Sequence, residues 1–212
     1  MQPTILAPAM LGISALVIVT SAVPRIRLFS LLKTLIAGLF GKKLRPKFRW
    51  KQDLKPEQAD WIGQCNQVDA ALNASIARII LVGSMGGTQP DNFLNSIGEG
   101  DGDNILVWKR KAEMYLIDRC KAGAASYTIV HPGGLTDTRG GERQVAIGLN
   151  DELLQRPVRS IPRAEVAEVC VQALDLMEAE NRSFDIVCDA PGVGEPLAPD
   201  GLEKLLSRLK GR

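Results

Sequence analysis

A lysine inside an apolar helical stripe is the first residue of this sequence that could take part in chemistry. The stretch NILVWKRKAEMYL, residues 104–116, follows a loop rich in glycine and acidic residues. If the stretch forms a helix, its spacing of four, three and four residues puts four positions on one face, Ile105, Lys109, Ala112 and Leu116. Lys109 would then point inward toward an anionic or hydroxylated ligand.

The same stretch allows a second interpretation. In it the buried stripe consists of Ile105, Trp108, Ala112 and Tyr115. Lys109 would belong, with its two basic neighbours, to a solvated edge whose aliphatic stems cover apolar surface. Spacing alone leaves both interpretations open, so the neighbouring strands must decide between them.

Small and polar residues follow three strand-like runs, 15–20, 78–82 and 127–130. In chain order they are Thr20, Ser21, Ala22, then Gly83, Ser84, Met85, then His131, Pro132, Gly133, Gly134. Ligands of open α/β sheets bind outside the carboxyl ends of the strands, so we expect these residues to lie together around a ligand. Small residues let a flat ligand approach the backbone, and hydroxyls and amides orient it. The pattern is typical of a nucleotide site.

Two glycine-rich turns resemble phosphate loops but do not qualify. Residues 83–87 follow a strand, yet residues 88–103 are rich in Gly, Asn, Asp and Pro and do not predict the helix whose N-terminus would hold a pyrophosphate. Residues 191–194 fail for the same reason. The only histidine, His131, is either a satisfied strand-end residue without a chemical role or a ligand contact through its backbone or ring.

The order of the elements predicts an α/β fold. Apolar strands alternate with helices, which indicates a parallel sheet with crossover helices. The helices are expected at 56–73, 104–116, 164–178 and 202–209, and the strands at 15–20, 78–82, 127–130 and 184–187. We expect one domain over 1–212 with residues 25–55 as an insertion. In this insertion, 29–40 is predicted as a surface or membrane-touching amphipathic helix and 41–51 as a basic loop.

Composition narrows the function only slightly. The chain has 212 residues, is 45% hydrophobic and 24% charged, and carries a net charge of +2, so it is globular and shows no bias toward nucleic acid. Phe48 and Trp50 among basic residues are too weak a signal to change that expectation. The four cysteines are far apart and form no zinc or disulfide pattern, so we expect no metal site and a reducing compartment, cytoplasmic or plastid rather than secreted.

The N-terminal stretch Pro3 to Val23 contains no charged side chain and permits a short membrane anchor by length. Several prolines, a glycine and hydroxyl residues dilute it, and its densest part is only ALVIV, residues 15–19. A buried strand of a parallel sheet is therefore the favoured interpretation, and a membrane partner is not expected.

Seven runs of the chain resemble one known family. They are TSAVP (20–24), DWIGQCNQVDAA (60–71), LVGSMGGT (81–88), LNSIG (94–98), NILVWKRKAEMYL (104–116), YTIVHPGGL (127–135) and IPRAEVAEVCVQAL (161–174). They are similar to atypical short-chain dehydrogenase/reductases, in particular the NmrA-like NAD(P)-binding proteins of plants and algae. The resemblance extends from about Gly12 to the C-terminal helix.

This resemblance implies a Rossmann-like domain that binds NADP or NAD. It implies that Lys109 hydrogen-bonds the nicotinamide ribose, that Ser84 is the family's strand-end serine, and that the segment from His131 to Leu135 runs under the nicotinamide. The family's usual tyrosine, four residues before the lysine, is replaced by Ile105. A proton for reduction would then come from Ser84, from water or from solvent, or from a catalytic Lys109 if burial lowers the pKa of its amine. A lost general acid typically costs about 10²–10⁴-fold in rate.

The resemblance also implies a missing part. Such proteins begin with a strand, a glycine-rich turn, a helix and two further strands, whereas the first strand of this chain matches the fourth of the family. Strand 15–20 would be an exposed edge, so we expect a partner or a further segment to cover it. The expected function is an NAD(P)H-dependent oxidoreductase of reduced or lost activity with an unspecified small-molecule substrate. The alternative is a non-catalytic nucleotide-binding regulatory or scaffold protein.

Overall fold

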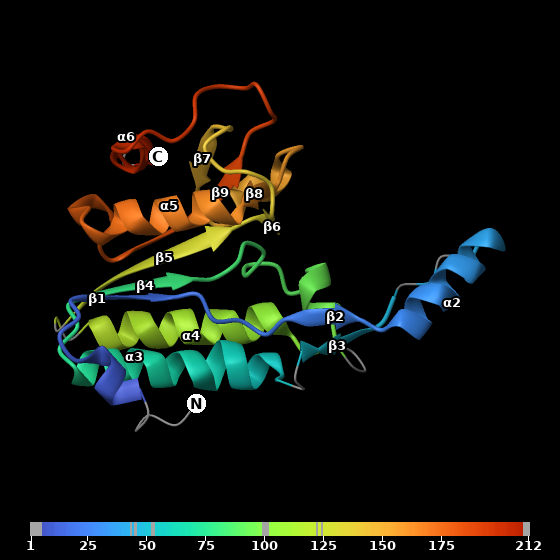
Figure 1. Ribbon diagram of the computed structural model, residues 1–212, viewed down its shortest axis with the longest axis horizontal. Helices are drawn as coiled ribbons and strands as arrows, with labels where there is room; N and C mark the ends of the chain where they lie inside the picture. The colour runs from blue at the N-terminus through green and yellow to red at the C-terminus, as the bar shows by residue number, and fades with distance from the viewer. Residues whose placement is uncertain are drawn as a thin grey trace.

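A five-stranded sheet forms the centre of the computed structural model, which describes residues 6–42, 44, 46–51, 54–98, 102–121, 123 and 125–209 (Figure 1). In spatial order the strands are β1 (Ala15–Ile18), β4 (Arg78–Val82), β5 (Ser126–Pro132), β9 (Arg182–Cys188) and β7 (Val145–Gly148). The first four run parallel to one another, and β7 pairs antiparallel with β9. The predicted α/β fold with a mostly parallel sheet is confirmed.

Helices cover both faces of the sheet (Figure 1). One face carries α3 (Gly63–Asn73) and α4 (Ile105–Cys120), and the other carries α5 (Arg163–Leu174) and α6 (Gly201–Leu209). The continuously apolar strand β4 follows from this arrangement, because Ile79 and Leu81 pack in the α3–α4 core while Ile80 packs in the α5–α6 core.

The predicted helices and strands are present with shifted ends. The helix predicted at 56–73 is a π-helical segment, η3 (Glu57–Ile62), that continues directly into α3. Strand β1 is two residues shorter than predicted, and β5 and β9 are longer. The remaining short elements are η1 (Ala7–Met10), η4 (Phe93–Ser96), η5 (Glu152–Gln155), η6 (Met177–Ala179), and the parallel pair β6 (Gly134–Thr136) and β8 (Ser160–Pro162).

An arm projects from the end of the sheet where the parallel strands terminate (Figure 1). It consists of β2 (Pro24–Ile26), α2 (Leu28–Leu39) and β3 (Phe48–Trp50), with β2 and β3 paired antiparallel. The helix predicted at 29–40 is therefore present. The loop predicted at 41–51 is wrong for Phe48 to Trp50, because this short and charged segment pairs with β2, which lies 22–26 residues earlier in the chain. Residues 43 and 45 of the predicted loop lie outside the described residues.

Strand β7 was also missed by the sequence patterns. Its four residues, VAIG, form a strand only because the edge of β9 offers a ladder. Among the described residues, no helix combines the length and the apolar character needed to cross a bilayer.

Candidate functional site

The three predicted strand ends lie side by side. Strands β1, β4 and β5 are parallel neighbours, so their carboxyl ends open at one edge of the sheet. Beyond the regular pairing, the Gly83 amide donates to the Val130 carbonyl over 2.9 Å and the Met85 amide to the Pro132 carbonyl over 3.1 Å. We call residues 20–22, 83–85 and 131–133 the strand-end ledge.

The ledge is not uniformly exposed. Thr20 and Ser21 are exposed and Ser84 is half-buried, whereas Ala22, Met85 and Pro132 are buried and only shape the surface. Gly134 and Leu135, also predicted to contact a cofactor, belong instead to β6, which pairs with Ser160 and Ile161 of β8 beside the main sheet. The structure therefore brings the nine predicted residues of the ledge together and places Gly134 and Leu135 in a neighbouring two-stranded sheet.

Lys109 points into the protein from α4, as the first interpretation of its helix predicts. Ile105, Lys109, Ala112 and Leu116 are all buried, whereas Trp108 and Tyr115 are only half-buried. The Lys109 Nζ atom lies 2.7 Å from Oδ1 of Asp60, a carboxylate that is 0% exposed. The other oxygen of Asp60 accepts a 2.9 Å hydrogen bond from the amide of Ala22, in the segment that follows β1.

Asp60 thus ties the lysine to the ledge. Helix segment η3 carries the carboxylate, α4 carries the ammonium group and the segment between β1 and β2 supplies the amide. The Oδ2 atom of Asp60 is satisfied by the Ala22 amide, whereas its buried Oδ1 atom has no hydrogen bond among the described residues and is compensated by the charge of Lys109. A lysine ammonium has three N–H donors, so the Asp60 contact leaves others for a ligand hydroxyl at the same end of the sheet.

Ile105 occupies the position at which the family resemblance places a tyrosine. Its side chain is 8% exposed and packs in an apolar cluster with Ala22, Trp50 and Leu106. The side chain provides no acidic proton. The site therefore contains the lysine of the expected pair but not its phenol.

The ring of His131 lies on the α4 side of the sheet between two carboxylates. Its Nε2 atom is 3.2 Å from Oε1 of Glu113, and its Nδ1 atom is 3.2 Å from Oδ1 of Asp185. Burial disfavours the charged ring, but the hydrogen bonds and negative charges of Asp185 and Glu113 outweigh it and raise the pKa of His131 to about 9. The ring is therefore a positively charged cross-link with both N–H groups engaged, which supports the interpretation of a satisfied residue.

The same network lowers the pKa of Glu113. Burial alone would raise this pKa, but the hydrogen bonds and charges of His131 and Arg110 favour the ionised carboxylate. Arg110 lies 2.9 Å from Glu113 on the same helix. Gly83 must be a glycine here, because a Cβ atom would lie 2.3 Å from Glu113 Oε1 and 2.9 Å from a carbon of the His131 ring.

Asp151 holds the turn that follows Ser84. Its carboxylate accepts hydrogen bonds from the Gly86 amide at 2.6 Å, the Thr88 amide at 2.9 Å and the Thr88 hydroxyl at 2.5 Å. Its own amide donates to Asp185 over 2.7 Å. The two amides of this turn are thus bound to an internal carboxylate, which agrees with the expectation that residues 83–87 are not a phosphate loop.

A small polar cavity lies between this turn and α4. It measures about 110 Å³ and is lined in part by Ser84, Thr88, Glu113, His131 and Asp185. Ligand pockets usually measure roughly 300–1,000 Å³, so this cavity suits water or a small polar group and not a dinucleotide.

Sequence patterns missed the acidic partners of the site. Asp60, Glu113, Asp151 and Asp185 come from four segments that are distant in sequence. One signal was present: Asp185 sits in the centre of the apolar strand FDIVC, where a carboxylate is exceptional unless it is paired.

The comparisons with known proteins agree with this geometry. The model of the NAD(P)H-binding family matches residues 2–176. An uncharacterized chloroplastic protein of Arabidopsis thaliana is 50% identical over 90% of this chain and 54% of its own length. Sanguinarine reductase of Eschscholzia californica is 44% identical over 92% of this chain and 72% of its own length. The chain thus spans only about half of the first relative.

A solved structure supports the fold. The oxidoreductase YlbE of Lactococcus lactis superposes with a TM-score of 0.60, covers 100% of this chain and 74% of its own, and is 20% identical. At this identity the likeness concerns the fold alone. The match over most of the chain and the two plant relatives establish the family: the chain belongs to the NAD(P)H-binding proteins, whose cofactor is NADP or NAD.

Proposed function

We propose that this chain is the nucleotide-binding part of an NAD(P)H-dependent reductase in which the strand-end ledge receives the nicotinamide ribose. The observation that carries the proposal is the buried ammonium group of Lys109, which lies 2.7 Å from an Asp60 carboxylate bonded to the Ala22 amide of the ledge. A structural lysine would normally place its charge in water. This one is oriented toward the edge of the sheet where ligands bind in α/β folds.

The residues divide the work of binding and orientation. Thr20 and Ser21 present hydroxyls on the exposed part of the ledge, and Lys109 donates to a ribose hydroxyl while Asp60 fixes its position. When bound, the reduced nicotinamide supplies a hydride to an electrophilic carbon of the substrate. One proton from solvent completes the reduction, so the products are the reduced substrate and the oxidised cofactor.

Ser84 is the residue best placed to relay that proton. It is half-buried on the ledge, it lines the 110 Å³ polar cavity, and its hydroxyl donates to the Met85 carbonyl over 3.0 Å. A serine is a weaker acid than a tyrosine, so we expect turnover below that of relatives with the phenol.

A second candidate function is nucleotide binding without catalysis, in a regulatory or scaffold role. Ile105 favours it, because an apolar residue packed against Ala22 and Trp50 fills the position of the missing phenol. Both candidates predict cofactor binding, and only the reductase predicts turnover.

The free edge of β1 leads to a proposal about completion of the sheet. Strand β1 pairs only with β4 in the described part of the chain, and Val19 just beyond it is 68% exposed. We propose that a further strand, from another segment or a partner, pairs with this edge and supplies the pyrophosphate contacts. For the compartment we propose the plastid, supported by the chloroplastic relative.

Cofactor titration tests the binding proposal. NADPH fluorescence should change on addition of the protein. The double variant Asp60→Asn/Lys109→Met, which removes the amine without leaving a buried charge, should bind about 10–100-fold more weakly, as expected for loss of a charged hydrogen bond. Lys111→Met on the exposed side of the same helix is the matched control and should bind normally. Absence of binding at millimolar NADPH would reject the proposal for this chain.

Turnover separates the two candidate functions. NADPH oxidation is followed with sanguinarine, after the name of the relative, and with a quinone and a flavin. Turnover that Asp60→Asn/Lys109→Met abolishes supports the reductase. Cofactor binding without turnover of any of the three supports the non-catalytic role.

A further inference from the structure

The helix of the arm presents its large apolar side chains to solvent. Leu28, Leu32, Leu35 and Leu39 are spaced by four, three and four residues and therefore form one stripe along α2. Leu28, Leu35 and Leu39 are 80%, 61% and 85% exposed. Phe29, at 85% exposure, extends the stripe at its edge.

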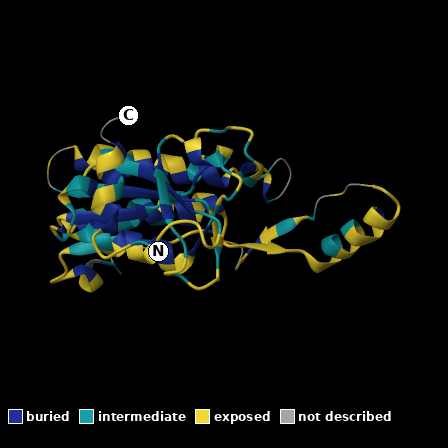
Figure 2. Ribbon diagram, turned by 90° about the horizontal axis from the view of Figure 1, so that it is seen from above, coloured by how far each residue is buried: buried dark blue, intermediate teal, exposed yellow. Residues whose placement is uncertain are grey.

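The opposite side of α2 carries small residues and faces the rest of the arm. Ala37 is buried, and the Ser30 hydroxyl accepts a 2.6 Å hydrogen bond from the Lys47 amide of the returning chain. A surface helix of a globular protein normally buries its apolar face. Here the small residues of α2 face the arm and its leucines face solvent. Figure 2 shows the arm extending away from the body of the protein, with most of its residues exposed.

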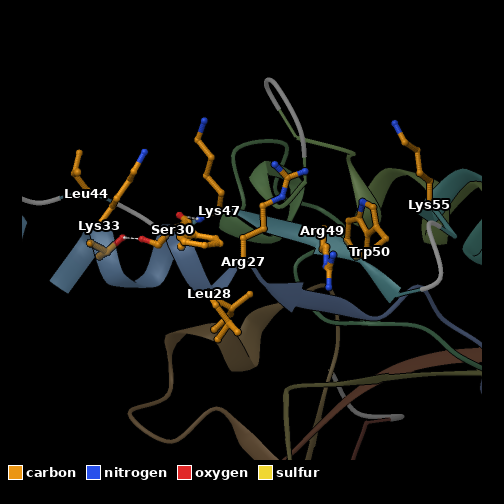
Figure 3. A pocket seen from close by; sticks show the side chains of 12 residues that line it. Arg27, Leu28, Ser30, Lys33, Leu44, Lys47, Arg49, Trp50 and Lys55 are labelled. Carbon is orange, nitrogen blue, oxygen red and sulfur yellow. Dashed lines mark hydrogen bonds between the residues drawn. The ribbon is translucent and has the colours of Figure 1, made fainter. Parts of the chain in front are cut away.

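The arm carries positive charge without negative charge. The stretch from Pro24 to Gln52 contains nine Lys or Arg residues and no Asp or Glu. A hollow of about 920 Å³ between α2 and the β2–β3 pair is lined in part by Lys33, Lys47 and Arg49. Figure 3 shows that Lys33, Lys47 and Lys55 extend to one side of the arm, whereas Leu28 extends to the other.

We propose that the arm docks on the surface of an anionic lipid bilayer. An apolar helical stripe combined with lysines on the remaining surface is the arrangement of helices that lie in the membrane interface. The leucines would enter the acyl boundary, and the lysines and arginines would contact lipid phosphates. Each basic residue near an anionic surface strengthens binding about fivefold.

The charge and the stripe together distinguish the bilayer from other occupants. A second copy of the arm would bring two surfaces of the same charge together, and a nucleic acid would leave the leucines in water. The sequence patterns predicted a surface or membrane-touching helix at 29–40, but a membrane partner was not expected because residues 3–23 did not qualify as a spanning anchor. A surface helix needs no spanning segment, so α2 changes that expectation.

The base of the arm is firmly attached to the body. Trp50 is 5% exposed, packs with Ala22 and Ile105, and donates from Nε1 to Asp103 Oδ2 over 2.6 Å. Because Ala22 and Ile105 lie at the ledge, docking of the arm would bring the strand-end ledge close to the bilayer.

Vesicle cosedimentation of the full chain tests the proposal. The protein should sediment with vesicles of phosphatidylcholine containing about one third phosphatidylglycerol, bind pure phosphatidylcholine at least tenfold more weakly, and be released by 0.5 M salt, since salt screens charge attraction. This comparison needs no variant. Equal binding to both vesicle types, or no binding to either, would overturn the proposal.

Variants then assign binding to the arm. Leu35→Gln/Leu39→Gln should weaken binding by about tenfold or more, and Lys33→Gln/Lys47→Gln by about 25-fold. Met177→Gln/Val171→Gln, which removes exposed apolar side chains on the body, is the matched control and should bind as the parent chain does. If the control weakens binding as much, if the leucine variant instead dissociates an oligomer, or if the arm binds an acidic protein or DNA in preference to vesicles, the proposal is wrong.

Discussion

Replacing Lys109 by methionine should destabilise the fold far more than an average substitution. Methionine keeps the apolar stem but leaves the Asp60 carboxylate, which is 0% exposed, without its cation at 2.7 Å. Breaking a buried ion pair by removing one partner costs about 3–5 kcal/mol. For a chain of 212 residues this corresponds to a Tm lower by roughly 6–20 °C, at about 2–4 °C per kcal/mol.

Urea unfolding followed by circular dichroism measures this change. The double variant Asp60→Asn/Lys109→Met should recover at least about 2 kcal/mol, because no buried charge remains and the asparagine oxygen still accepts from the Ala22 amide. Lys111→Met, at an exposed position of α4 where the ammonium lies 4.1 Å from the centroid of the Trp108 ring, should change stability by no more than about 1 kcal/mol. If Lys109→Met loses no more stability than Lys111→Met, the ion pair does not hold the ledge and the argument fails.

Three further perturbations have defined outcomes. The two carboxylate partners of His131 raise its folded-state pKa from 6.5 to about 9, so the stability that the charged ring contributes is complete below pH 6.5 and is lost as the pH rises through 9. The free energy of unfolding should fall by about 3 kcal/mol across that window. His131→Gln should remove this pH dependence, and an unchanged slope in the variant would contradict the network. Asp151→Ala should speed hydrogen exchange at the Gly86 and Thr88 amides at least tenfold, and unchanged exchange would show that the carboxylate does not hold the turn. Val19→Lys should reduce concentration-dependent light scattering without lowering Tm, because a charge beside an open strand edge blocks pairing between chains. Unaltered scattering would mean that chains do not associate through the β1 edge.

Local patterns were sufficient for the elements that decide the fold class. Strand β4 has the predicted bounds because both of its faces are buried, so Ile79 to Val82 are all apolar. Its first residue, Arg78, is buried with its guanidinium group bonded to Thr128 and to the Ala173 carbonyl. Helix α4 was placed correctly because its inward face repeats at helical spacing over several turns. Strands β3 and β7 were missed because their pairing partners lie far away in the sequence, and pairing, not composition, makes them strands.

The candidate site was predictable in part for the same reason. The three strand ends could be grouped because parallel neighbours always open at one edge of a sheet. Helical spacing left two directions for the Lys109 side chain, inward or into solvent, and could not decide between them. The decision depends on Asp60, which is brought close to Lys109 only by the packing of η3 against α4. The His131 network joins a helix and two strands, so no spacing in the chain encodes it.

The account depends most directly on where a reduced nicotinamide cofactor binds. Hydrogen exchange measured by mass spectrometry, with and without saturating NADPH, locates that contact on the backbone. Slower exchange should appear at residues 20–22, 83–85 and 131–135 and be absent from the arm helix, residues 28–39. Protection confined to other segments, or no protection at millimolar NADPH, would contradict the assignment of the ledge as the cofactor site.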